Sequence, residues 1–193
     1  MRQHIRSTER IHGIFTKGGD KPNIVPAETE QYWFIRSDTI ASLQPLKQRV
    51  VTALEGAASA CGCSMDHEWV EETFAEMIDN QPMVQAYVEN AARLGRTVRS
   101  PQAAGHKVVG STDMGNVSYL VPSIHPMIQV APTGTPIHSV AFAEWACSAD
   151  GDRAVLDGAK AMAMTTIDLW TRTGLLEQVR ADFANRPTGV AVF

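Results

Sequence analysis

The sequence lacks long apolar runs, an excess of positive charge and any set of cysteines with a familiar pairing pattern. No stretch approaches the roughly 20 consecutive apolar residues that a bilayer-spanning helix needs, and residues 1–6 (MRQHIR) are not followed by the apolar core of a signal peptide. Lys and Arg number 17 against 21 Asp and Glu, without a basic cluster, which argues against nucleic acid as the main partner. These absences predict a cytoplasmic protein, not bound to a membrane, whose partners are small molecules or proteins.

Cysteine is scarce as well. The three cysteines, Cys61, Cys63 and Cys147, match neither a zinc-binding spacing nor a C-x-x-C redox motif, so we predict buried or incidental thiols in a reducing compartment. What is present is an ordinary globular composition of 193 residues, 44% hydrophobic and 20% charged. A chain of this length and composition can bury one core or two small ones.

The N-terminal pattern begins with a predicted β-hairpin. An extended segment at 10–15 runs into a turn at 16–22 that contains paired glycines and a proline. Residues 23–36 then alternate in character and are rich in β-branched and aromatic side chains, which favours a second strand.

A helix is expected next, up to Gly62, with Ser42 as its N-cap and Pro45 in the tolerated first turn. Residues 63–74 alternate loosely and predict an acidic strand at a sheet edge. The resulting order of strand, strand, helix and strand is a split β-α-β pattern without its first strand and helix. We therefore expect an α+β domain at 1–75 and a chain that begins partway through a larger fold.

A second domain is predicted at 76–193. Asn80 should cap a helix that has Pro82 near its start and ends at Gly95. Residues 128–131 are apolar and bounded by prolines, which is consistent with a short buried strand. A longer helix is expected where apolar residues share one stripe, namely Val155, Ala159, Met162, Thr166 and Trp170.

Two loop segments flank the apolar residues 128–131 and carry the candidate chemistry. They are GSTDMGN (110–116) and GTPIHS (134–139). Small residues let a backbone approach a ligand closely, Asp113 can orient a histidine, and a neutral imidazole such as that of His138 is the commonest metal ligand. An ordinary Asx or ST turn explains the first segment equally well.

Short motifs run in order along nearly the whole chain. They are RQHI (2–5), RIHGI (10–14), GG (18–19), PNIVPA (22–27), FIR (34–36), GSTDMGNVS (110–118), VPSIHP (121–126), GTPIHS (134–139) and KAMAMTTIDL (160–169). Together they resemble the C-terminal part of the metal-dependent amidohydrolases and peptidases that include aminoacylases, glutamate carboxypeptidases, p-aminobenzoyl-glutamate hydrolase and β-alanyl-lysine dipeptidases. The resemblance is strongest to the p-aminobenzoyl-glutamate hydrolase and β-alanyl dipeptidase branch.

The resemblance implies a ferredoxin-like dimerisation (lid) domain at 1–75, followed by the C-terminal segment of a zinc-peptidase-like α/β catalytic domain. It also implies metal-dependent hydrolysis of an amide or peptide bond in an N-acyl amino acid or dipeptide, with two divalent ions, usually zinc, and a homodimer formed through the lid. The family's late metal-binding histidine matches His138. Its other ligands and its glutamate base have no counterpart, because no H-x-D motif occurs and the Glu71-Glu72 pair lies in the lid segment.

Further residues match or adjoin positions that contact substrate in the family: Asn23, Arg36, Ser111, Thr112, Asp113 and Gly134. By this resemblance Arg36 offers a planar fork to the carboxylate of a C-terminal amino acid, and Asn23 can hydrogen-bond the substrate. Their ordinary alternatives are a solvated strand-end arginine and a turn asparagine. Related branches often have glutamate at the position of Thr112, so the role of this threonine stays open.

Three interpretations stay open as well. The chain is a piece of a full amidohydrolase, or the smaller product of a split gene that assembles with a separate N-terminal chain, or a non-catalytic dimerisation or amino-acid-binding module. With one metal ligand and no general base, we predict that the chain is inactive by itself. The third interpretation predicts that small molecules bind without any metal.

Overall fold

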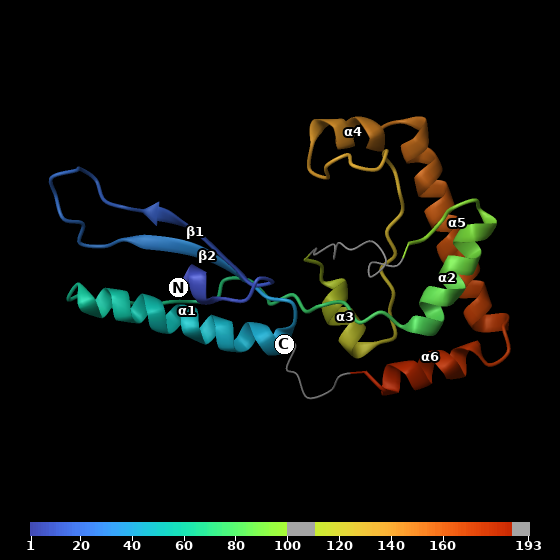
Figure 1. The fold of residues 1–193 in the computed structure, drawn as a ribbon, viewed down its shortest axis with the longest axis horizontal. Coiled ribbons are helices and arrows are strands. Elements are labelled where there is room, and N and C mark those ends of the chain that lie inside the picture. The colour runs from blue at the N-terminus through green and yellow to red at the C-terminus, as the bar shows by residue number, and fades with distance from the viewer. Residues whose placement is uncertain (100–110, 187–193) are drawn as a thin grey trace. The chain divides into compact units, whose positions relative to one another are not determined.

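A computed structural model describes residues 1–99 and 111–186, which fall into two compact units. The first unit is Met1–Glu76, and the second begins at Met77 (Figure 1). The described residues contain helices and one two-stranded sheet, so the expected mixture of α and β structure is confirmed. The assignment of the units as a lid domain and a catalytic segment stays a prediction.

The first unit is built on the predicted hairpin. After a short 3-10 turn, η1 (Arg2–His4), strand β1 (Arg10–Lys17) pairs antiparallel with β2 (Glu30–Arg36). The second arm begins at Glu30 and not at residue 23, because glycines and prolines interrupt the connection at 18–29.

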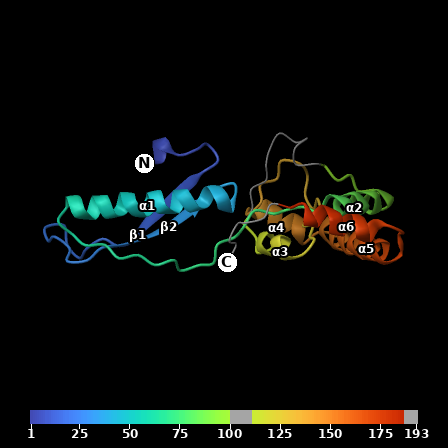
Figure 2. The ribbon, with the colours of Figure 1, turned by 90° about the horizontal axis from the view of Figure 1, so that it is seen from below.

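Helix α1 (Ile40–Ala60) lies along one face of this hairpin (Figure 2). Its buried residues Leu46 and Val50 pack with Ile11 of β1, and Trp33 and Ile35 of β2 complete this small core. The hairpin therefore faces α1 with Ile11 of β1 and with alternate residues of β2, as the two-residue period of a strand requires.

The predicted start of α1 was wrong. Thr39 is the N-cap, and Ser42 lies at the third helical position, where the two residues form a reciprocal capping box. Pro45 consequently lies in the second turn and leaves the carbonyl of Ala41 without the usual helical donor.

The predicted edge strand at 63–74 does not form. Side chains hold this segment in place of a hydrogen-bonded ladder. The Lys47 ammonium of α1 lies 4.0 Å from the centre of the Trp69 ring, and Tyr32 Oη donates to Glu71 Oε1 at 2.9 Å. A strand requires a neighbour that shares its backbone hydrogen bonds, and none of the described residues supplies one here.

The second unit consists of helices. Helices α2 (Gln81–Arg93), α5 (Ala149–Thr171) and α6 (Leu175–Ala184) pack on one another. Asn80 caps α2 as predicted, because its Oδ1 accepts from Met83 N at 3.3 Å. The same buried side chain donates to the Val179 carbonyl of α6 at 3.0 Å, which joins the two helices.

Two further helices were not predicted, α3 (Met114–Leu120) and α4 (Val140–Ala146). Residues 128–131 form no strand, so that prediction was wrong. In the described ranges 1–99 and 111–186, no helix combines the length and the apolar character that crossing a membrane demands.

The apolar stripe predicted on the last long helix does exist on α5, but it faces outward. The core side of α5 carries small or polar residues, including Ala154, Ala161 and Thr165, whereas Met162 and Trp170 are exposed. The spacing therefore predicted the helix correctly and its buried face incorrectly.

Candidate functional site

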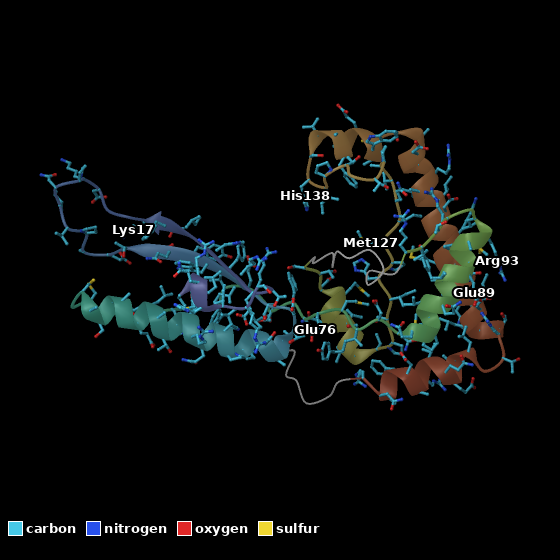
Figure 3. All side chains as sticks on the ribbon, in the orientation of Figure 1. Lys17, Glu76, Glu89, Arg93, Met127 and His138 are labelled. Atoms are coloured by element: carbon cyan, nitrogen blue, oxygen red, sulfur yellow. The ribbon has the colours of Figure 1, made fainter. Side chains whose placement is uncertain are left out.

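His138, the proposed metal ligand, lies in the turn that leads into α4 (Figure 3). Its side chain is exposed and makes no hydrogen bond to any residue of the described ranges. Among the residues of those ranges, His138 is the non-glycine residue whose backbone φ angle is positive, at 60°. This left-handed conformation costs an L-residue about 1–2 kcal/mol, and such strain is typical of positions that present a side chain for function.

The backbone around His138 is held by its neighbours and not by the histidine itself. Ser139 caps α4 by accepting from Phe142 N at 3.2 Å, and it donates to the Pro136 carbonyl at 2.6 Å. Gly134 has a φ of 95°, which favours glycine, and it is exposed. The imidazole of His138 can therefore bind a ligand without breaking a contact that supports the turn.

The first loop segment forms the turn that starts α3. Thr112 Oγ1 accepts from Met114 N at 3.3 Å, so the ordinary ST turn is present. Asp113 occupies the N-cap position, but its side chain makes no capping hydrogen bond. Ser111 and Asp113 are exposed and Thr112 is half-buried, which leaves the Asp113 carboxylate accessible. Gly110 lies outside the described residues.

The first unit carries the two predicted substrate contacts, Asn23 and Arg36. Asn23 lies in a turn closed by the hydrogen bond from Ile24 N to the Lys21 carbonyl at 3.2 Å, and it is exposed. Arg36 is the exposed last residue of β2, with its guanidinium 5.7 Å from the centre of the Phe34 ring. Asn23 therefore lies in the connection that precedes β2, and Arg36 lies at the far end of this strand, which is about 20 Å long for its seven residues.

No metal site is complete within the part of the chain that the structure describes. There, no three His, Cys, Asp or Glu side chains gather closely enough to hold an ion. A catalytic zinc ion takes three protein ligands and a structural one takes four, so His138 alone does not fit the metal that the resemblance implies.

A hollow of about 470 Å³ opens elsewhere in the second unit. Its wall includes Arg96, Trp145 and Arg153 and none of the predicted site residues. Arg96 donates to Asp157 at 2.9 Å and to the Gln129 carbonyl at 3.1 Å. We regard these contacts as structural, because they tie the chain after α2 to α5 and to the segment 128–131.

The sequence interpretation missed a buried polar network between α2 and α5. Asn90, fully buried, donates from Nδ2 to Asp168 Oδ2 at 2.7 Å and to Thr165 Oγ1 at 3.3 Å, and it accepts from Arg93 at 3.2 Å. Asp168 and Thr165 are more than 70 residues away in sequence, and no local motif marks such a pair. A polar residue in the apolar face of the predicted α2 helix was the signal that could have found it.

Another missed pair concerns Asp79 and His125. Burial raises the pKa of the Asp79 carboxyl, and the nearby His125 partly offsets this effect. The backbone explains the proximity, because Asn80 N donates to the Ser123 carbonyl at 3.0 Å next to a bridge between Asp79 and Ser123.

Comparison with known proteins shows which proteins this chain is similar to. No family model matches the chain. The chain is 37% identical to the Xaa-Arg dipeptidase of Mus musculus and 35% identical to that of Homo sapiens. Each alignment spans 183 residues, which are 95% of this chain and 42% of the relative.

A more distant relative is one of the subunits of the p-aminobenzoyl-glutamate hydrolase of Escherichia coli (strain K12), which is 25% identical over 234 residues, or 94% of this chain and 49% of that protein. The chain thus spans less than half the length of the curated relatives that it matches. The similarity runs through almost the entire sequence, so this chain is similar to part of a dipeptidase and to part of a hydrolase subunit.

Proposed function

We propose that this chain contributes a lid domain and the C-terminal catalytic segment to a metal-dependent hydrolase of amide or peptide bonds. The substrates are N-acyl amino acids or dipeptides, of the Xaa-Arg, β-alanyl or p-aminobenzoyl-glutamate type. One observation carries the proposal, namely 37% identity to a dipeptidase over 95% of the chain. Two divalent ions, zinc by family resemblance, would be bound in the complete enzyme, and the lid would form a homodimer.

The chain's own residues have separate tasks in this proposal. His138 presents an exposed imidazole as one metal ligand, and its strained backbone supports that role. Arg36 binds the substrate carboxylate through its planar fork, and Asn23 hydrogen-bonds substrate. Because Asn23 precedes β2 and Arg36 ends this strand, we assign the two side chains to different substrate molecules or different protomers.

In the same proposal, two loops of the second unit line the metal-containing active site of the complete enzyme. The segment Ser111, Thr112 and Asp113 supplies hydroxyls and an accessible carboxylate, and Gly134 offers its backbone N–H. The exposure of Ser111, Asp113 and Gly134 supports these assignments.

We further propose that the 193-residue chain alone does not hydrolyse these substrates. The described residues gather no three-ligand cluster, which supports a source of the remaining ligands and the general base in another polypeptide. The E. coli relative is named as a subunit of its enzyme, which favours a partner chain as the source.

Purified chain should therefore be assayed with p-aminobenzoyl-glutamate and with an Xaa-Arg dipeptide, alone and mixed with a second polypeptide. This second polypeptide is the part of mouse Xaa-Arg dipeptidase outside the aligned region. We expect hydrolysis only in the mixture, and we expect a chelator to abolish it. Hydrolysis by the chain alone, or chelator-resistant hydrolysis by the mixture, would contradict the proposal.

A second candidate is a non-catalytic module that binds amino acids or dimerises. It is favoured by the absence of a three-ligand cluster among residues 1–99 and 111–186. Calorimetric titration of the chain with an Xaa-Arg dipeptide, with and without chelator, distinguishes the two. Equal binding in both conditions, without activity in the mixture, supports the module.

A further inference from the structure

The outer face of α5 is apolar and uncovered by the residues that the structure describes. Val155 is 70% exposed, Met162 54% and Trp170 80%. At 100° per residue these three side chains lie on one stripe, which is about 22 Å long at 1.5 Å per residue. Between Val155 and Trp170, the other exposed residues of this face are uncharged, namely Leu156, Ala159, Ala163, Thr166 and Ile167. The exposed Lys160 lies at the edge of the face, about 20° beyond Ile167 around the helix.

The opposite face of α5 is already buried. Ala154 and Ala161 are each 1% exposed, and Thr165 is 4% exposed. This face packs on α2, where Tyr87, Ala91 and Ala161 form one cluster. A helix that is apolar on both sides belongs in the interior of a domain, between two layers.

The sizes of the side chains point the same way. The fully buried residues of α5 are small, and Leu169 is a large apolar side chain that packs partly buried against α2 and α6. The large apolar side chains of this helix that are exposed are Val155, Leu156, Met162, Ile167 and Trp170. A helix that needed only α2 and α6 as neighbours would bury its larger side chains, because each contributes more stability than alanine. The exposed stripe is therefore typical of a helix face that packs against a further layer of polypeptide.

We infer that the outer face of α5, from Val155 to Trp170, is the docking surface for the polypeptide that completes this hydrolase fold. The inference rests on the proposed function for the identity of that partner. The relatives supply the argument for the occupant, since this chain spans 42% of a dipeptidase and the rest of such a fold has to pack somewhere. The uncharged stripe calls for an equally apolar partner layer.

The test adds one negative charge on the stripe or one residue beyond it. Trp170→Glu places a carboxylate in the stripe, and Thr171→Glu places it 100° further around the helix, off the stripe. Both side chains are exposed, so both variants should fold as wild type does. The partner is the part of mouse Xaa-Arg dipeptidase outside the aligned region, and sedimentation measures the complex.

We expect wild type and Thr171→Glu to bind this partner equally and Trp170→Glu to bind at least tenfold more weakly. In the wild-type complex, peroxide should oxidise Met162 several-fold more slowly than in the free chain. Absence of a complex, equal binding of both variants or unchanged oxidation of Met162 would overturn the inference. Dimers of the chain alone that Trp170→Glu disrupts would overturn it in favour of a second copy as occupant.

The same mixtures separate this inference from the proposed function. A complex that protects Met162 from oxidation but hydrolyses neither substrate would support the docking surface and contradict the proposed function. Chelator-sensitive hydrolysis that is unchanged in Trp170→Glu would support the proposed function and contradict the docking surface.

Discussion

At the scale of single residues, Gly13 shows how the hairpin accommodates Trp33. The two residues are paired across β1 and β2, and a Cβ on Gly13 would run into the indole ring. Gly13→Ala should therefore lower the free energy of unfolding by about 1–3 kcal/mol, since the ring must leave its place in the small core. Urea denaturation measures the change.

Gly18→Ala is the matched control. No heavy atom lies within 4 Å of the added Cβ, and Gly18 has no left-handed backbone. This variant should be as stable as wild type or slightly more stable. Equal stability of the two variants would show that the Trp33 ring does not require glycine opposite it.

His138 combines backbone strain with the proposed metal role, and a pair of variants separates the two. His138→Gly should raise the free energy of unfolding by about 1 kcal/mol relative to His138→Ala, because glycine tolerates the positive φ of 60°. Both variants should abolish hydrolysis in the complemented enzyme. A glycine variant that is no more stable than the alanine variant would contradict the strain, and one that retains full activity would remove the metal role.

At the scale of elements, an ion pair joins α2 to the end of α5. Arg172 donates to Glu89 Oε2 at 2.8 Å, and hydrogen bonds from Gln85 and Arg172 lower the pKa of the Glu89 carboxyl. A lowered folded-state pKa means that this pair stabilises the fold above the ordinary carboxyl pKa of about 4.3. The contribution is lost as the pH falls through the folded-state value.

The advantage in melting temperature of wild type over Glu89→Gln should therefore be present at pH 6–7 and shrink as the pH falls below about 4. It should also shrink in high salt, because both side chains are partly exposed. A double-mutant cycle with Arg172→Gln isolates the pair. A difference that stays constant from pH 7 to pH 3 would contradict the assignment.

Local signals predicted some elements well. Asn80 followed by Pro82 marked the start of α2, and the glycines and prolines at 18–29 separated two strands. The cap of α1 was misplaced because Thr39 and Ser42 are both good caps. The structure uses both, one as the N-cap and one as the third residue of the box.

Other elements depend on what surrounds them. Residues 63–74 have the alternation of a strand, but strand formation needs a paired neighbour, which the described residues do not provide. Residues 128–131 form no ladder for the same reason. The site residues show a similar limit, because the sequence placed His138 in a loop but could not foresee its left-handed backbone.

At the scale of the whole molecule, metal dependence is the sharpest question. If the described residues lack a complete site, a chelator should leave the melting midpoint of the isolated chain unchanged. Zinc titrated by calorimetry should show no tight stoichiometric binding, and any weak binding should vanish in His138→Gly. A chelator-induced drop in the midpoint would show that this chain completes a metal site by itself.

Features that depend on neighbouring residues, or on several motifs taken together, follow directly from the amino-acid sequence of this protein. Turn residues set the hairpin, helix caps set the start of α2, and collinear motifs indicated a resemblance to amidohydrolases and peptidases that agrees with the similarity to a dipeptidase. The buried face of α5 and the meeting of polar groups such as Asn90 and Asp168 emerge only when the chain is folded. The physical reason is that periodicity defines a stripe on a helix, whereas burial depends on the neighbours that distant parts of the chain bring to it.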